Sequence, residues 1–162
     1  MFYMDIPHAD FNILAIRTKE HSAYIQKALD YVVGKYGGTI NPKANELYIN
    51  HPIRVANCFQ WSKDLQVIAL LHDVLEDTTT VHNELFDLFP SNVAKAVVNL
   101  TRIEGQSWND YIKLVGSDPY ARNVKCADLI DNMNLTRMQR VTIEDARRQR
   151  KYAEALVKLM EE

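Results

Sequence analysis

Apolar residues recur three and four positions apart along most of the chain, and this spacing limits the fold more than any other feature. In residues 21–36, Ala28 and Val32 fall on one helical face, and Gly37 and Gly38 follow as a stop signal. Comparable segments lie at residues 51–61, 65–77, 81–89, 91–101, 107–116, 119–133 and 142–160. Because no segment alternates as a β-strand does, the sequence predicts an all-α fold, a compact bundle of about seven helices.

Polar residues at the expected helix starts support this division. Ser91 precedes an apolar-periodic segment and is expected to act as its N-cap. Ser107 with Asp110, and Thr142 with Asp145, have the spacing of a capping box, in which each polar side chain satisfies a free backbone N–H group. These signals predict where three of the helices begin.

The composition is that of a globular domain, with 47% apolar and 25% charged residues among 162, and we expect one domain over residues 1–162. The formal net charge of −2 argues against broad nucleic-acid binding. No apolar run reaches the roughly 18 residues of a membrane span. Cys58 and Cys126 lie in apolar patterns and form no CxxC motif, so we expect both to be free thiols that pack as small apolar side chains. We therefore expect a cytoplasmic protein, and the sequence leaves homo-oligomer formation open.

The segment LLHDVLEDTTT, residues 70–80, gathers charged groups at the end of an apolar run. On a continuous helix His72 would lie over Glu76, and Asp73 over Asp77. The helix is expected to end near residue 78, where negative charge opposes the helix dipole at a typical cost of about 0.3–1 kcal/mol per group. The position is thus unfavourable unless something compensates the charge.

A solvated acidic helix end would be the simpler interpretation of such a segment. Here, however, His72 and Asp73 are embedded between leucines and need a partner. A divalent cation would relieve the repulsion and use the imidazole as a ligand. Nitrogen and carboxylate oxygen together suit Mn²⁺, Fe²⁺, Co²⁺ or Zn²⁺.

Two other positions could complete such a site. His51 begins a helix at YINHP, where an isolated histidine is also compatible with a surface or capping role. Asp128 lies among apolar neighbours in VKCADLIDNM, and its alternative partner is Lys125, three residues earlier. The ordered pattern is therefore one His, an adjacent His-Asp pair, and a later Asp.

These segments resemble the HD-domain superfamily of metal-dependent phosphohydrolases. They are most similar to the hydrolase domain of the RelA/SpoT alarmone enzymes and to the single-domain SpoT-homologue hydrolases. YINHPIRVA resembles the family pattern Y-I-x-H-P-x-x-V-A, IALLHDVLEDTTT resembles A-L-L-H-D-x-x-E-D-T-x-T, and VKCADLIDNM resembles K-L-A-D-x-L-x-N-M. The similarity runs from about Tyr48 to Met138 and is weaker through the last helix.

The resemblance implies a role for each matching residue. It makes one Mn²⁺ ion the expected cofactor and assigns its ligands as His51, His72, Asp73 and Asp128. Glu76 and Asp77 would orient and deprotonate the attacking water.

The same resemblance implies a set of substrate-binding residues. Asn132 matches a family residue that contacts the nucleotide, although a polar residue near a helix end would also explain it. Arg148 and Tyr152 have the spacing of an Arg and a Tyr that touch ligand in small homologues, but ARRQRK is also compatible with a solvated basic face. Lys43 is the only cation in the loop before His51.

The chain departs from the family in two places near this pocket. The basic pair that stacks on guanine is replaced by Ile40 and Asn41. Asp131 replaces the usual aromatic residue or His before Asn132, and we expect it to add negative charge near the mouth of the site. The phosphate chemistry is expected to be intact, whereas guanine specificity is in question.

The resulting functional hypothesis is a Mn²⁺-dependent phosphohydrolase that removes the 3′-pyrophosphate from guanosine or adenosine alarmones, (p)ppGpp or ppApp. A second hypothesis keeps the enzyme class but makes the substrate a nucleoside monophosphate or NADPH. A third is a metal-binding antitoxin or nucleotide sensor, although the retained Glu76 and Asp77 argue against it. In each case the partner is a small nucleotide, with no membrane association expected.

Overall fold

Helices make up most of the computed structural model, which describes residues 23–161. The elements are α1 (Ala23–Tyr36), β1 (Ile40–Asn41), β2 (Glu46–Leu47), α2 (Asn50–Asn57), α3 (Lys63–Leu71), α4 (Val74–Asp77), α5 (His82–Leu88), α6 (Ser91–Leu100), α7 (Trp108–Gly116), α8 (Pro119–Met133), the 3₁₀ helix η2 (Leu135–Arg137) and α9 (Ile143–Glu161). The predicted all-α class is confirmed. Residues 21 and 22 of the first expected helix lie outside the described residues.

Helix α3 is the centre of the core. Residues 67–71 are five consecutive apolar residues, and all five are fully buried. A helix buries consecutive residues only when neighbours surround it on every side. Helices α1, α2, α6 and α8 provide that enclosure. The charged residues that follow α3 in the chain therefore lie at the edge of the core.

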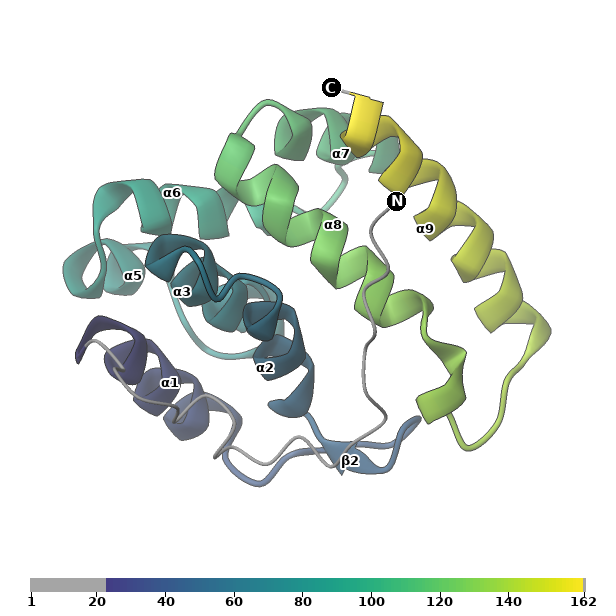
Figure 1. Ribbon diagram of the computed structural model, residues 1–162, viewed down its shortest axis with the longest axis horizontal. Helices are drawn as coiled ribbons and strands as arrows, with labels where there is room; N and C mark the ends of the chain where they lie inside the picture. The colour runs from purple at the N-terminus through teal and green to yellow at the C-terminus, as the bar shows by residue number, and fades with distance from the viewer. Residues whose placement is uncertain (1–22, 162) are drawn as a thin grey trace.

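Helix α8 is the second organising element, and it packs on α2, α3, α6, α7 and α9 (Figure 1). Its buried face carries Val124, Ala127 and Leu129, but also Asp128 and Asp131. Helix α9 lies alongside α8 (Figure 1). No helix within residues 23–161 combines the length and apolar character needed to cross a membrane.

The predicted helix starts are confirmed at two of three positions. The Ser107 hydroxyl accepts a hydrogen bond from the Asp110 N–H group. Thr142 likewise accepts from the Asp145 N–H group, at 3.2 Å. The expectation for Ser91 is wrong, because α6 begins at Ser91 itself and Pro90 occupies the N-cap position without a side-chain hydrogen bond.

The expected continuous helix over residues 65–77 is also wrong. Helix α3 ends at Leu71, and His72 and Asp73 form a junction before the short helix α4. Asp73 has φ −102° and ψ −2°, which turns the chain out of the helical path. Its carbonyl oxygen accepts hydrogen bonds from the N–H groups of Glu76 and Asp77. The acidic pair therefore sits on a separate turn whose direction the junction sets.

A β-hairpin that was not predicted from the sequence precedes α2. Ile40 pairs with Leu47 and Asn41 with Glu46, in strands too short to display an alternating pattern. Asn45 adopts a left-handed conformation with φ 53°, which asparagine tolerates better than most residues, and its N–H group donates to the Asn41 carbonyl oxygen. The Glu46 side chain of the hairpin contacts Arg54 of α2 and Arg137 of η2.

Candidate functional site

The four predicted metal ligands come from three neighbouring elements. His51 lies in the first turn of α2, His72 and Asp73 form the α3–α4 junction, and Asp128 lies in the middle of α8. Because α2, α3 and α8 pack on one another, these side chains meet at the boundary of the core. His72 and Asp128 are each only 2% exposed.

The ligand atoms converge closely. The separations are 3.0 Å for His51 Nε2–Asp128 Oδ1, 3.1 Å for His72 Nε2–Asp73 Oδ2, 3.2 Å between the two Nε2 atoms, and 3.6 Å for both His51 Nε2–Asp73 Oδ2 and His72 Nε2–Asp128 Oδ1. Ligands about 2.1 Å from a shared divalent ion lie about 3.0–3.4 Å from one another. The observed spacing therefore fits one cation.

Hydrogen bonds to the far side of each imidazole explain why a cation is needed. His72 Nδ1 lies 2.7 Å from the Ala69 carbonyl oxygen, so this nitrogen is the N–H donor. His51 Nδ1 lies 2.7 Å from Asp131 Oδ2 and donates likewise. In the neutral rings both Nε2 lone pairs then point at each other and at two carboxylates. A set of acceptors without a donor is what a metal ion satisfies.

The charges in this cluster alter one another's ionisation. Burial alone would lower the pKa of His72, but Asp73 and Asp128 raise it well above its ordinary value. Burial alone would also lower the pKa of His51, but its hydrogen bonds to Asp128 and Asp131, together with the charge of Asp128, raise it. Burial opposes the charged form of Asp128, yet the adjacent lysine and imidazoles hold the pKa of this carboxyl well below its usual range. The carboxylates thus favour positive charge at this position.

Asp128 contacts Lys125 with one carboxylate oxygen and the two histidines with the other. Its Oδ2 atom lies 2.7 Å from Lys125 Nζ, so the expected ion pair exists. Its Oδ1 atom faces the two imidazoles and also accepts a hydrogen bond from Asn132 Nδ2 at 2.5 Å. The ion pair therefore orients the carboxylate and leaves one oxygen toward the metal position.

Glu76 and Asp77 lie on α4 beside this cluster. Together with Tyr48 and Asp73 they line a cavity of about 190 Å³ that opens over the ligand atoms. Glu76 Oε1 accepts a hydrogen bond from the Arg102 N–H group at 2.6 Å, which fixes one end of the carboxylate. Burial, followed by the nearby charge of Asp73, raises the pKa of Asp77. A carboxylate with a raised pKa is a better proton acceptor.

The four predicted substrate-binding residues gather at one adjoining cavity of about 100 Å³. Lys43 comes from the hairpin, Asn132 from α8, and Arg148 and Tyr152 from α9. Asn132 also lines the cavity above the ligand cluster, so the two spaces share a wall. The Lys43 ammonium group is 3.3 Å from Asp145 Oδ1. The roles of these residues stay a prediction.

A third depression, of about 270 Å³, collects positively charged side chains, of which the sequence analysis assigned only Arg148 to substrate binding. Arg102, Lys125, Arg148 and Lys151 line it beside Glu76 and Asp128. Lys151 Nζ lies 4.0 Å from the centre of the Trp108 ring. Burial and then repulsion from the neighbouring cations lower the pKa of Lys151. Clustered cations of this kind fit an anionic ligand.

Asp131 and Arg54 were also missed as parts of the site. Asp131 was expected to add charge near the mouth, but it is 7% exposed and bonded to His51 Nδ1. Its charge is compensated by Arg54, whose Nε lies 2.8 Å from Asp131 Oδ1. An Arg between apolar residues in HPIRVA requires a buried acidic partner, and this signal was available in the sequence.

Comparison with known proteins places the chain in a family. No protein-family model matches it. It is 33% identical over 135 residues to a guanosine-3′,5′-bis(diphosphate) 3′-pyrophosphohydrolase of Aquifex aeolicus, covering 76% of this chain and 19% of that protein. The chain is a SpoT/RelA hydrolase-like HD-domain protein. The relationship inferred from its three motifs is thus confirmed.

Further relatives of this HD domain agree. It is 34% identical over 88 residues to a probable enzyme of the same name from Mycoplasma pneumoniae, covering 52% of this chain and 12% of that protein. It is 28% identical over 127 residues to a GTP pyrophosphokinase of Brucella abortus, covering 70% of this chain and 17% of that protein. The HD domain therefore spans a fifth or less of the length of these relatives.

A solved structure supports the fold of the HD domain. A metazoan SpoT orthologue, which hydrolyses ppGpp, superposes with a TM-score of 0.72 and 23% identity, covering 87% of both chains. The arrangement of His51, His72 and Asp128, together with the hydrolase relatives, identifies a site for a divalent metal.

Proposed function

We propose that this HD domain is a Mn²⁺-dependent phosphohydrolase that releases pyrophosphate from the ribose 3′ position of (p)ppGpp or ppApp. The observation that carries the proposal is the position of the candidate ligand cluster, which lies between the acidic pair of Glu76 and Asp77 and the basic depression. Two curated relatives carry the name of this reaction. Manganese is the proposed ion because it accepts both imidazole and carboxylate ligands.

Each part of the site has a proposed chemical role. A bound divalent ion would polarise the phosphoryl oxygen and make a water molecule more acidic. Asp77, whose pKa is raised, would take the proton from the attacking water. Glu76 would orient that water, because its other oxygen is already held by the Arg102 N–H group. Asn132 would fix Asp128 and contact the ribose side of the substrate.

The basic depression would bind the pyrophosphate that leaves. It adjoins Glu76 and Asp128, and it presents Arg102, Arg148 and Lys151 to one space. A pyrophosphate carries several negative charges, and charge-assisted hydrogen bonds to such groups are strong. A single phosphate would leave part of this charge unpaired. The depression thus favours a pyrophosphorylated substrate over a nucleoside monophosphate.

The base pocket would be the smaller cavity lined by Lys43 and Tyr152. Its hairpin wall contributes Asn41, with Ile40 half exposed, and the ammonium group of Lys43 is engaged by Asp145. No free cation of this hairpin is therefore placed to stack on guanine. This observation keeps adenosine alarmones as candidates beside guanosine ones.

The deciding experiment is product release from the Mn²⁺-loaded protein. The substrates are ppGpp, ppApp, NADPH and a set of nucleoside monophosphates, and pyrophosphate and orthophosphate are measured separately. Pyrophosphate from an alarmone would establish the reaction, and the ratio of kcat/KM values for ppGpp and ppApp would give the base preference. Orthophosphate from NADPH or a monophosphate would support the second hypothesis. Tight nucleotide binding without turnover would support the sensor.

Lys151→Met is expected to raise KM for the alarmone about tenfold or more while changing kcat less. The substitution removes one cation from the depression but keeps an apolar stem on Trp108. A hydrogen bond to a charged group contributes roughly 1.5–3 kcal/mol, and 1.4 kcal/mol corresponds to a factor of ten. Steady-state kinetics measures both constants.

The matched control for that variant is Lys158→Met on the same helix. Lys158 Nζ contacts Asn109 and does not line the depression. Its kinetic constants should equal those of the wild type. A Lys151→Met enzyme with an unchanged KM would show that the substrate does not occupy the basic depression.

A further inference from the structure

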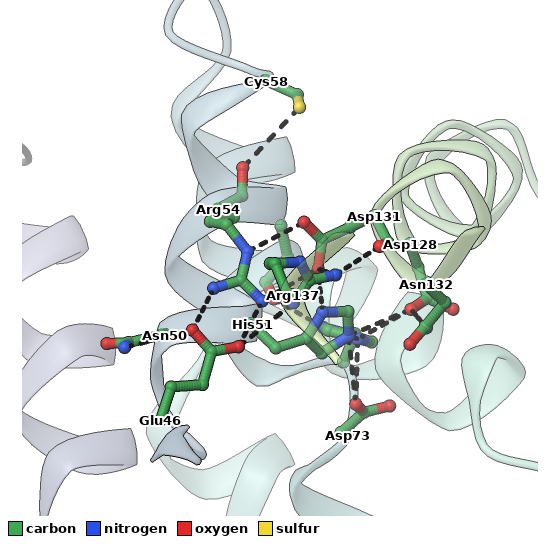
Figure 2. Close-up of polar contacts among 12 residues, drawn as sticks. Glu46, Asn50, His51, Arg54, Cys58, Asp73, Asp128, Asp131, Asn132 and Arg137 are labelled. Atoms are coloured by element: carbon green, nitrogen blue, oxygen red, sulfur yellow. Dashed lines mark hydrogen bonds and ion pairs between the residues drawn. The ribbon is translucent and has the colours of Figure 1, made fainter. Parts of the chain in front are cut away.

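A partly buried ion network supports His51 from the side away from the metal position (Figure 2). Asp131 Oδ2 accepts from His51 Nδ1 at 2.7 Å, and Asp131 Oδ1 accepts from Arg54 Nε at 2.8 Å. Arg54 also forms two hydrogen bonds of 2.9 Å with Glu46. Arg137 Nη1 joins Glu46 at 3.1 Å, and its Nη2 lies 3.0 Å from Asp131 Oδ2.

The network balances its own charges. Two guanidinium groups face two carboxylates, so their formal charges cancel. Both oxygens of Asp131 are occupied by donors from His51, Arg54 and Arg137. Asp131 is therefore not available as a metal ligand. It can act on the metal position only through the imidazole of His51.

The two histidines of the cluster are held in different ways. The Nδ1–H group of His72 donates to the Ala69 carbonyl oxygen, three residues earlier in the last turn of α3. His51 lies in the first turn of α2, and its Nδ1–H group instead donates to a side chain from α8, 80 residues later. The tautomer and direction of His51 thus depend on a long-range contact.

We propose that Asp131 is the positioning residue of the metal site. It keeps the proton of His51 on Nδ1, so the Nε2 lone pair is presented beside His72 Nε2 and Asp128 Oδ1. Arg54 in turn fixes Asp131, with Glu46 as the brace between the hairpin and α2. The inference rests on the proposed function in one respect, namely that His51 binds the metal.

The network also connects the metal site to the substrate cavities. Glu46 belongs to β2, the strand paired with β1, and β1 and the following turn line the base pocket; Arg137 belongs to η2, which lines that pocket directly. Arg137 lines that pocket and also the cavity over the ligand cluster. The same ion pairs that orient His51 therefore hold the adjoining walls in register with it.

The test is the affinity for Mn²⁺ of the purified full chain carrying Asp131→Asn. An asparagine can no longer satisfy both neighbours: its amide nitrogen must face either the Arg54 guanidinium group or His51 Nδ1. The second orientation would move the imidazole proton to Nε2 and block the ligand position. Loss of such a partner typically weakens metal binding about 10–100-fold. Isothermal titration calorimetry with Mn²⁺ should therefore give a dissociation constant at least about tenfold higher.

A matched control makes the same chemical change on the same helix. Asp118→Asn alters the N-cap of α8, where asparagine caps as well as aspartate, and Asp118 makes no contact with the ligand cluster. Its Mn²⁺ affinity should equal that of the wild type. The absorption spectrum of bound Co²⁺ is a second readout, because it reports the coordination number and ligand field of the metal, and it should change only in Asp131→Asn.

A third variant covers the case in which Asp131→Asn does not fold. Arg54→Gln combined with Asp131→Asn removes the buried cation together with its partner, and circular dichroism checks the fold. Weak Mn²⁺ binding by the folded double variant would support the inference. A Mn²⁺ affinity within about twofold of the wild type in either folded variant would overturn it. Because the readout is metal affinity, this result is separate from whether the wild type hydrolyses an alarmone.

Discussion

Glu76→Gln is expected to lower kcat for alarmone hydrolysis by about 100- to 10,000-fold, the usual contribution of a positioned acid–base group. Glutamine keeps the size of the side chain and can still accept the hydrogen bond from the Arg102 N–H group. It removes the negative charge that would order and polarise the attacking water. Glu76 is exposed and is not one of the converging ligands, so Mn²⁺ affinity should change little.

Two further variants separate the members of the acidic pair. Asp77→Asn should cause a comparable loss in kcat if Asp77 is the proton acceptor, because its amide cannot take a proton. Glu84→Gln is the control for the chemical change, since Glu84 pairs with Lys35 on the surface, and such exposed pairs contribute about 0–1 kcal/mol. Full activity of Glu76→Gln with normal metal content would remove Glu76 from the mechanism.

Most of the fold and the set of candidate ligands could be predicted because their signals are local. Helical spacing, the Gly37 stop and the capping pairs at Ser107 and Thr142 each depend on residues within a few positions. The candidate ligands could be identified because His72 and Asp128 are polar groups in apolar surroundings. Burial of a polar group without a partner is costly, so a polar residue within an apolar segment indicates a site from the sequence alone.

The features that the sequence did not predict depend on long-range contacts or on small departures from regular structure. The break at His72 and Asp73 follows no Gly or Pro, so helical periodicity runs through it unchanged. The partner of Arg54 is Asp131, 77 residues later, and nothing in the local pattern identifies it. The basic depression likewise combines Arg102, after α6, with residues of α8 and α9. Its members become a group only when the helices pack.

Asp128→Asn is expected to abolish the stabilisation that Mn²⁺ gives to the protein. A ligand whose concentration is 100 times its dissociation constant stabilises the folded state by about 2.7 kcal/mol, and this raises Tm. The amide of asparagine has a single oxygen, which the ammonium group of Lys125 would retain, so an NH₂ group would replace the oxygen nearest to His51 Nε2. Differential scanning calorimetry with and without Mn²⁺ measures the effect, and a chelator should lower the Tm of the Mn²⁺-loaded wild type but not that of Asp128→Asn.

Lys125→Met distinguishes a ligand role of Asp128 from a purely structural one. Both variants break the buried ion pair, and leaving one partner uncompensated costs about 3–5 kcal/mol, so both metal-free proteins should unfold at lower temperature. Lys125→Met, however, retains the carboxylate that faces the imidazoles, and its Tm should still rise with Mn²⁺. If Asp128→Asn responded to Mn²⁺ as strongly as Lys125→Met does, Asp128 would serve only the ion pair. A response confined to Lys125→Met requires the carboxylate itself at the metal, because both variants break the same ion pair and only Lys125→Met keeps the carboxylate.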